Sequence, residues 1–187
     1  MSWPGIERSR LSRAGILVVA TGSLLWPATT RGQSPDRPDP APVSLLVSVS
    51  GRTLSVLRGE EILHRFPVGV GTGTRLNRRE GEDWVFTTPI GDFEVGRKKE
   101  GPVWYAPDWY YVERGLPIPT AYSEVRYRPG VLGDYALYLS DEIAIHGTDD
   151  ESTVGRASSH GCLRMRNVDI AVVFPLVEVG TRVVIVP

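Results

Sequence analysis

The chain has 187 residues, a length at which a single domain buries most of its apolar surface without dividing into separate cores. Hydrophobic residues make up 41% and charged residues 23%, as in ordinary globular proteins, while 20 Gly and 15 Pro favour turns and short strands over long helices. The formal net charge of −1 offers no basic surface for a polyanion, so we exclude nucleic acid as a partner.

Residues 1–33 have the order of a secretory signal peptide. Three arginines come early, an apolar run of about 13 residues follows from Ala14, and small and polar residues end the segment. The run is shorter than the roughly 20 residues that cross a bilayer as a helix. We therefore expect export to the periplasm or cell envelope, with an uncleaved N-terminal anchor as the alternative. The segment contains no cysteine, which excludes a lipid anchor.

Residues 34–42, with the sequence SPDRPDPAP, are predicted to form a Pro-rich linker. Proline removes backbone N–H donors and restricts φ, so this segment forms neither a helix nor a paired strand easily. The folded domain is expected to occupy residues 43–187.

The domain opens with a predicted meander of three antiparallel strands. Apolar residues alternate with polar ones in residues 43–50 and 52–57, and a third apolar run follows in residues 61–71. Ser-Gly and Arg-Gly-Glu turn signals separate the three runs, which favours short hairpin connections between them.

Two segments of different character follow the meander. Residues 87–99 contain a Pro-Ile-Gly turn that leads into a strand. Residues 101–119 are aromatic and interrupted by prolines, with no clear period, so we expect a loop or an irregular strand there. Their aromatic side chains are expected to be core residues more often than walls of a cleft.

Residues 136–147 are predicted to form a β-hairpin, because two apolar runs flank a Ser-Asp-Glu turn. The second strand of this hairpin ends at His146. A last strand is expected in residues 180–187, which close the chain with the sequence GTRVVIVP.

Residues 167–179 are the one good helix candidate. Asn167 is expected to be the N-cap, and Asp169 lies in the first turn, where the helix dipole favours an acidic side chain. Pro175 is expected to end the helix early.

Cys162 is the only cysteine of the chain, and it lies in a glycine-containing turn. An exported protein normally uses cysteines in pairs, so a lone thiol is either inert or kept for its reactivity. Only a thiolate attacks well, and a free thiol is roughly 3% ionised at pH 7. A neighbouring imidazole and guanidinium that ionised it fully would contribute about thirtyfold in rate. His146 and His160 are candidate imidazoles, and Arg164 is the candidate cation.

A zinc site is the competing interpretation of the same residues. Cys162 with two histidines and one aspartate offers ligands that zinc accepts, from His146, His160 and either Asp149 or Asp150. Their spacing matches no common zinc pattern. We therefore expect no metal and no other cofactor.

Two motifs carry a resemblance to a known family. The sequence IHGT at residues 145–148 and the sequence SSHGCLRM at residues 158–165, with Asn167 and Asp169 following, closely resemble the L,D-transpeptidase catalytic domain, also called the YkuD domain. Further similar segments extend the resemblance over about residues 43–187.

The resemblance implies a mainly β fold, a β-sandwich of mixed sheets with one short helix after the catalytic motif. It implies that Cys162 attacks the carbonyl between the L-centre and the terminal D-Ala of a peptidoglycan stem peptide, so that an acyl-enzyme forms and D-Ala leaves. An amine of a neighbouring stem, or a Lys of an envelope protein, then takes the acyl group. The alternatives are an L,D-carboxypeptidase that transfers to water and, from a different class, a non-catalytic peptidoglycan-binding protein.

The resemblance also assigns roles to the residues around Cys162. His146 is the expected general base, with the Gly147 carbonyl orienting it. The backbone amides of His160, Gly161 and Cys162 are expected to form the oxyanion hole. Ser159 and Arg164 are expected to shape the substrate pocket. Since no wall-binding module accompanies this domain, we expect it to find its polymer through the catalytic domain alone.

Overall fold

The computed structural model describes residues 41–78 and 80–187. The signal peptide predicted at residues 1–33 and nearly all of the predicted linker at 34–42 lie outside these ranges. Within them, every helix is too short or too polar to span a membrane.

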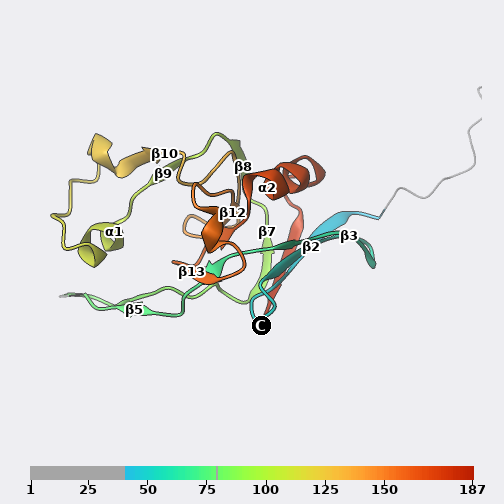
Figure 1. The fold of residues 1–187 in the computed structure, drawn as a ribbon, viewed down its shortest axis with the longest axis horizontal. Coiled ribbons are helices and arrows are strands. Elements are labelled where there is room, and N and C mark those ends of the chain that lie inside the picture. Colours follow the sequence, from blue (N-terminus) through green and yellow to red (C-terminus); the bar gives the residue numbers. More distant parts are fainter. Residues whose placement is uncertain (1–40, 79) are drawn as a thin grey trace, which may run out of the picture. The chain divides into compact units, whose positions relative to one another are not determined.

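The largest sheet has five strands in the order β3-β2-β1-β15-β7 (Figure 1). Its strands are β1 (Val43–Ser48), β2 (Thr53–Arg58), β3 (Glu61–Pro67), β7 (Gly91–Glu94) and β15 (Arg182–Val186). Strands β1 and β15 pair in parallel and the other neighbours pair antiparallel, so the sheet is mixed. The predicted meander, the predicted strand after the Pro-Ile-Gly turn and the last strand are confirmed.

Fully buried side chains alternate with more exposed ones along β1 and β15, and this alternation gives the sheet a buried face. Leu45 and Val47 are fully buried, whereas Leu46 between them is 37% exposed. In β15, Val183 and Ile185 are buried in the same way. Side chains two residues apart lie on the same face of a strand, so each strand contributes one apolar row to the core.

The second sheet has four strands in the order β14-β12-β11-β8 and carries the residues of the predicted site. Its strands are β8 (Arg97–Glu100), β11 (Tyr135–Tyr138), β12 (Ala144–His146) and β14 (Leu163–Arg164). The predicted hairpin is confirmed as β11 and β12, and its second strand ends at His146. Strand β14 pairs with β12 in parallel, with Arg164 opposite His146.

Three two-stranded sheets complete the strand inventory of the described residues. They consist of β4 (Val70–Gly71) with β13 (Ala157–Ser159), β5 (Arg75–Leu76) with β6 (Trp84–Val85), and β9 (Val103–Tyr105) with β10 (Tyr127–Pro129). In Figure 1, β9 and β10 lie on one side of β12, and β2 and β3 lie on the other.

The predicted helix is present as α2 (Asn167–Val173), but the predicted N-cap is wrong. Arg166 occupies the N-cap position with extended backbone angles, and Asn167 is the first helical residue. The Asn167 side chain forms hydrogen bonds outside the helix instead. Asp169 lies in the first turn as expected, and Pro175 lies in a short 3-10 turn that directly follows α2, so the early end of the helix is confirmed.

A second short helix, α1 (Asp108–Glu113), corrects the interpretation of residues 101–119 as loop or irregular strand. That interpretation was right for β9 and wrong for this helix. Sequence periodicity does not reveal a helix of six residues, because tertiary contacts stabilise it. The buried Arg126 side chain supplies such contacts, donating to Asp108 and to the carbonyl oxygens of Ala106 and Pro119.

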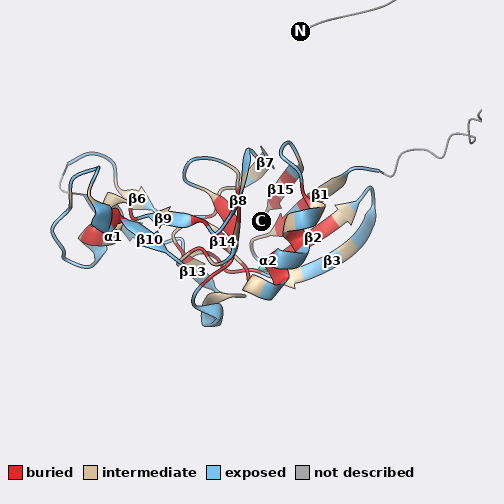
Figure 2. Cartoon of the chain, turned by 90° about the horizontal axis from the view of Figure 1, so that it is seen from above, coloured by how far each residue is buried: buried red, intermediate tan, exposed pale blue. Residues whose placement is uncertain are grey.

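The core lies between the five-stranded sheet, the four-stranded sheet and α2, and its buried strands and helix face are marked in Figure 2. Leu163 and Met165, which follow Cys162 in the chain, are fully buried in this core. Their burial anchors the segment that carries the thiol. The expected fold class, mainly β with mixed sheets and a short helix after the cysteine motif, is confirmed.

Candidate active site

Cys162 lies in the tight connection between β13 and β14. Gly161 before it has φ of +127°, a conformation that side-chain-bearing residues rarely adopt. A Cβ atom at this position would also meet the Thr87 carbonyl oxygen and the Ile143 side chain at 3.2 Å. Glycine is therefore required at position 161 for the chain to turn and present the thiol.

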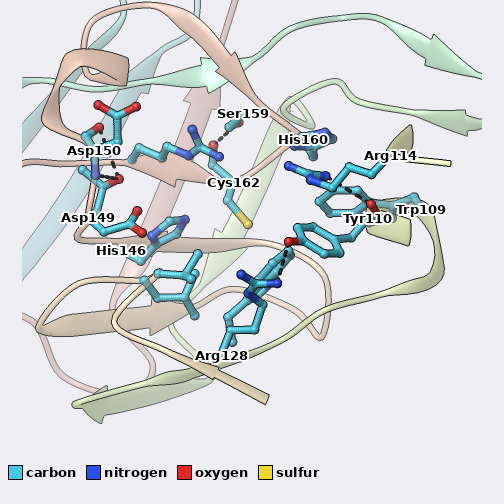
Figure 3. A pocket seen from close by; sticks show the side chains of 15 residues that line it. Trp109, Tyr110, Arg114, Arg128, His146, Asp149, Asp150, Ser159, His160 and Cys162 are labelled. Carbon is cyan, nitrogen blue, oxygen red and sulfur yellow. Dashed lines mark hydrogen bonds between the residues drawn. The ribbon is translucent and has the colours of Figure 1, made fainter. Parts of the chain in front are cut away.

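The Cys162 side chain faces a pocket of about 320 Å³, a volume within the range of small-molecule sites. Figure 3 shows the sulfur pointing into this pocket, with His146 on one side and the Tyr110 hydroxyl on the other. The site residues predicted from the sequence come together here, and those that line the pocket are His146, Ser159, His160, Cys162 and Arg164.

The hydrogen bond of His146 defines its tautomer. Nδ1 of His146 lies 2.5 Å from the carbonyl oxygen of Gly147. A carbonyl oxygen can only accept, so Nδ1 carries the proton and Nε2 of the neutral ring has a free lone pair. This arrangement fits a proton acceptor.

Burial determines the protonation of the Cys162–His146 pair. The pKa of His146 is lowered to about 4, mainly by burial and to a smaller extent by the charge of Arg164, while the Gly147 carbonyl opposes the shift. Burial also raises the pKa of the Cys162 thiol, against the smaller effects of the Ala144 backbone N–H and Arg164. At neutral pH the pair is therefore a neutral thiol and a neutral imidazole. The thirtyfold gain that a fully ionised thiol would bring is therefore not favoured by these surroundings, because desolvation outweighs the nearby cation.

Asn167 holds the Gly147 segment in place. Its Nδ2 donates to the Thr148 carbonyl at 3.0 Å, and its Oδ1 accepts from the Asp134 backbone N–H at 3.2 Å. Glycine is needed beneath this side chain, because a Cβ at Gly147 would lie 2.1 Å from Oδ1 of Asn167. The carbonyl that orients His146 is thus fixed from α2.

Ser159 closes the turn around the nucleophile. Its hydroxyl donates to the Cys162 carbonyl oxygen at 2.6 Å and accepts from the Gly161 backbone N–H at 3.1 Å. The Gly161 amide is therefore already occupied in this structure. Among the described residues, the amides of His160 and Cys162 donate to no protein acceptor.

His160 faces a different environment from His146. Its ring stacks on Trp109 with centroids 4.0 Å apart and meets Phe86 edge-on at 4.4 Å. Its Nε2 lies 3.0 Å from a carboxylate oxygen of Glu113, at the end of α1. The interactions of His160 tie the thiol-bearing turn to the α1 segment.

The aromatic segment of residues 101–119 divides between core and pocket. Tyr111 is buried, as expected for aromatic core residues, whereas Trp104, Trp109 and Tyr110 line the pocket. Sequence reasoning missed four further pocket residues, because none belongs to a motif, and they are Arg114, Arg128, Val131 and Leu132. In residues 41–78 and 80–187, no group of three or more His, Cys, Asp and Glu side chains is arranged to hold a metal ion.

Solved structures share this fold. The L,D-transpeptidase of Xylanimonas cellulosilytica (residues 123–326) superposes with a TM-score of 0.57 and 20% identity, covering 81% of this chain and 63% of that chain. An L,D-transpeptidase from Mycobacterium smegmatis gives a TM-score of 0.56 and 20% identity, covering 79% of this chain and 59% of that chain. The fold is therefore that of the L,D-transpeptidases.

The family profile of the YkuD domain, described as the L,D-transpeptidase catalytic domain, matches residues 42–185. The chain belongs to this family.

Curated relatives agree with this assignment over part of their length. The Escherichia coli K12 protein named "Probable L,D-transpeptidase YbiS" is 37% identical over 130 residues, which are 67% of this chain and 38% of the relative. The Salmonella typhimurium protein named "Probable L,D-transpeptidase ErfK/SrfK" is 33% identical over 187 residues, 98% of this chain and 53% of the relative. The chain thus spans between about two fifths and half of the length of these relatives.

Proposed function

We propose that this chain is a peptidoglycan L,D-transpeptidase that uses Cys162 as nucleophile and His146 as general base. The supporting observation is the neutral thiol–imidazole pair at the pocket, in which the His146 tautomer leaves Nε2 free to accept a proton. The substrate is a stem tetrapeptide, cleaved at the bond between its L-centre and the terminal D-Ala.

In the first step Sγ of Cys162 attacks the carbonyl carbon while His146 Nε2 takes the thiol proton. The oxyanion that forms is stabilised by the His160 and Cys162 amides, which have no other acceptor among the described residues. The Gly161 amide contributes once the Ser159 hydroxyl releases it. When the intermediate collapses, the C–N bond breaks, His146 returns the proton to the departing amine, and D-Ala leaves a thioester on Cys162.

In the second step an amine attacks the thioester and gives a proton to His146. The C–S bond breaks, the thiolate recovers its proton, and a new amide remains. The acceptor is an amine of a neighbouring stem peptide, or a Lys of an envelope protein. Transfer to water instead would make the protein an L,D-carboxypeptidase. In this proposal Arg164 shapes the pocket beside His146.

The proposed site of action is the cell envelope. Residues 1–33 act as a signal peptide or anchor in this proposal, and residues 34–42 tether the catalytic domain of residues 43–187. This placement is supported by the order of basic, apolar and small residues at the N-terminus.

The proposal is tested by incubating the protein with disaccharide tetrapeptide and following the products by mass spectrometry. Cross-linked dimer with released D-Ala is expected. Tripeptide alone would identify a carboxypeptidase, and unchanged substrate would leave only binding. The Cys162→Ala variant is expected to abolish every product.

A carbapenem provides a separate test of the nucleophile. We expect the intact mass of the protein to rise by one inhibitor, because the strained lactam acylates the thiol. The same incubation with the Cys162→Ala variant should leave the mass unchanged. A wild-type mass without a shift would contradict the assignment of Cys162.

A further inference from the structure

Three arginines line the pocket, and they differ in how far their charge is already engaged. Arg114 donates to a carboxylate oxygen of Glu113 at 3.0 Å, so its charge faces an acid. Arg164 lies opposite His146 in the β12–β14 register and so belongs to the general-base side of the pocket. Among the described residues neither Arg164 nor the third arginine, Arg128, forms an ion pair, but only Arg128 lies away from His146.

Arg128 lies on β10 and has a neutral partner. Its Nη1 donates to the Tyr110 hydroxyl at 2.5 Å, and its guanidinium carbon lies 4.9 Å from the centroid of the Tyr110 ring. In the part of the chain that the structure describes, no ion pair includes Arg128. Its positive charge is therefore available to a ligand.

Tyr110 adds a second donor at the same place. Since its oxygen accepts the hydrogen bond from Arg128, its own O–H proton is directed elsewhere and can be donated. The remaining N–H groups of a guanidinium and one phenol proton together match the two oxygens of a carboxylate.

The position of this donor pair relative to the nucleophile indicates which carboxylate it fits. Figure 3 shows Arg128 and the Tyr110 hydroxyl on one side of the Cys162 sulfur, and His146 with Asp149 on the other side. The Arg128–Tyr110 donor pair therefore lies across the thiol from the general-base side of the pocket, which carries Arg164 as well as Asp149.

We propose that Arg128, supported by Tyr110, binds the terminal carboxylate of the D-residue that departs when Cys162 is acylated. The inference rests on the proposed function. In such a substrate one amide nitrogen and one Cα separate the scissile carbonyl from the terminal carboxylate. The group that binds the carboxylate therefore has to lie about the length of one amino-acid residue from the thiol.

The same geometry determines the preferred acceptor. The amine that attacks the thioester approaches from the side on which the first amine departed. Arg128 therefore favours acceptors whose amine is adjacent to a carboxylate over simple alkyl amines. It acts as a specificity-determining residue for both half-reactions.

The test compares two substrates that differ only at this group, a disaccharide tetrapeptide with a free D-Ala carboxylate and its C-terminal amide. The wild type is expected to prefer the acid in kcat/KM by about 10- to 100-fold, the range of a charge-assisted hydrogen bond. Arg128→Gln is expected to lose most of this preference by slowing the acid and leaving the amide nearly unchanged. Tyr110→Phe, which keeps the ring and removes the O–H, is expected to lose a smaller part.

Arg182→Gln is the matched control. Arg182 pairs with Asp92 on the five-stranded sheet and does not line the pocket, so the acid preference should be retained. Equal losses on both substrates in Arg128→Gln, or an intact preference, would overturn the inference.

A binding measurement separates this inference from the proposed function. In a Cys162→Ala background, calorimetry with the acid and the amide should show a preference for the acid that Arg128→Gln removes. If the acid binds with that preference but the wild type turns over neither substrate, the proposed transpeptidase function is refuted and the carboxylate site is retained. Turnover without any preference in rate or affinity would refute the carboxylate site alone.

Discussion

At the scale of single residues, the hydrogen bond from His146 to the Gly147 carbonyl has the largest chemical consequence. It assigns the proton to Nδ1 and leaves Nε2 with a free lone pair, as the proposed general base requires. Because burial disfavours both charged forms, the proposed mechanism has the thiol lose its proton as it reacts rather than beforehand. The sequence predicted which residues form the site, but it could not show that desolvation dominates their charges.

The first prediction concerns the acid limb of activity. The base must be neutral, and the pKa of His146 is lowered to about 4, so kcat/KM should persist at pH 5, where an ordinary histidine would be mostly protonated. A pH profile of tetrapeptide turnover from pH 3.5 to 8 checks this. A midpoint near 6.5 would contradict the buried neutral base.

The second prediction concerns stability at the same residue. The unfolded His146 binds a proton near pH 6.5 and the folded one only near pH 4, so the unfolded state binds more protons between these values. The free energy of unfolding should fall as the pH is lowered through this window, by at most about 3 kcal/mol from this group. The free energies of unfolding of the wild type and His146→Gln, measured by denaturant titration, should converge as the pH falls. Parallel curves from pH 7 to 4 would refute the shift.

At the scale of elements, α2 contributes to the site through its first residue. Asn167 bridges the Thr148 carbonyl and the Asp134 amide and covers Gly147. The expected capping role was wrong, because a side chain at a helix start can satisfy backbone groups of another element instead of its own helix. No sequence spacing distinguishes these two outcomes.

The third prediction tests this bridge. Asn167→Ala should lower the free energy of unfolding by about 1–3 kcal/mol, because it leaves the Thr148 carbonyl and the Asp134 amide without their partner. It should also lower kcat more than it raises KM, since the orientation of His146 depends on Gly147. Asn167→Asp serves as the control with a smaller change, because it keeps an acceptor for the Asp134 backbone N–H and removes only the donor to the Thr148 carbonyl. Full activity in both variants would show that the bridge does not position the base.

The α1 element contributes through contacts to the thiol-bearing turn. His160 stacks on Trp109 and bonds to Glu113, so α1 packs directly against the turn. The fourth prediction is that Glu113→Gln, which weakens this bond but keeps its shape, lowers kcat/KM severalfold with little change in melting temperature. Wild-type kinetics in this variant would mean that α1 does not support the turn.

At the scale of the molecule, the parallel pairing of β1 with β15 joins the beginning and the end of the domain. Ile185 in β15 is 1% exposed and packs in the core, whereas Val184 beside it is half-buried on the opposite face. The fifth prediction is that Ile185→Ala lowers the free energy of unfolding by about 2–5 kcal/mol, because it leaves a cavity. Val184→Ala should cost clearly less. Equal decreases in the free energy of unfolding for the two variants, measured by denaturant titration, would contradict the assignment of the buried face.

The sequence by itself determined the strand meander, the hairpin that ends at His146, and the motif around Cys162. These features depend on local periodicity, turn residues and a long specific pattern. The tertiary structure alone decided the helix α1, the bridging role of Asn167, the neutral state of the thiol and the place of Arg128 in the pocket. Each of these depends on burial, or on contacts between residues that are distant in the chain, and neither leaves a signal in a single sequence.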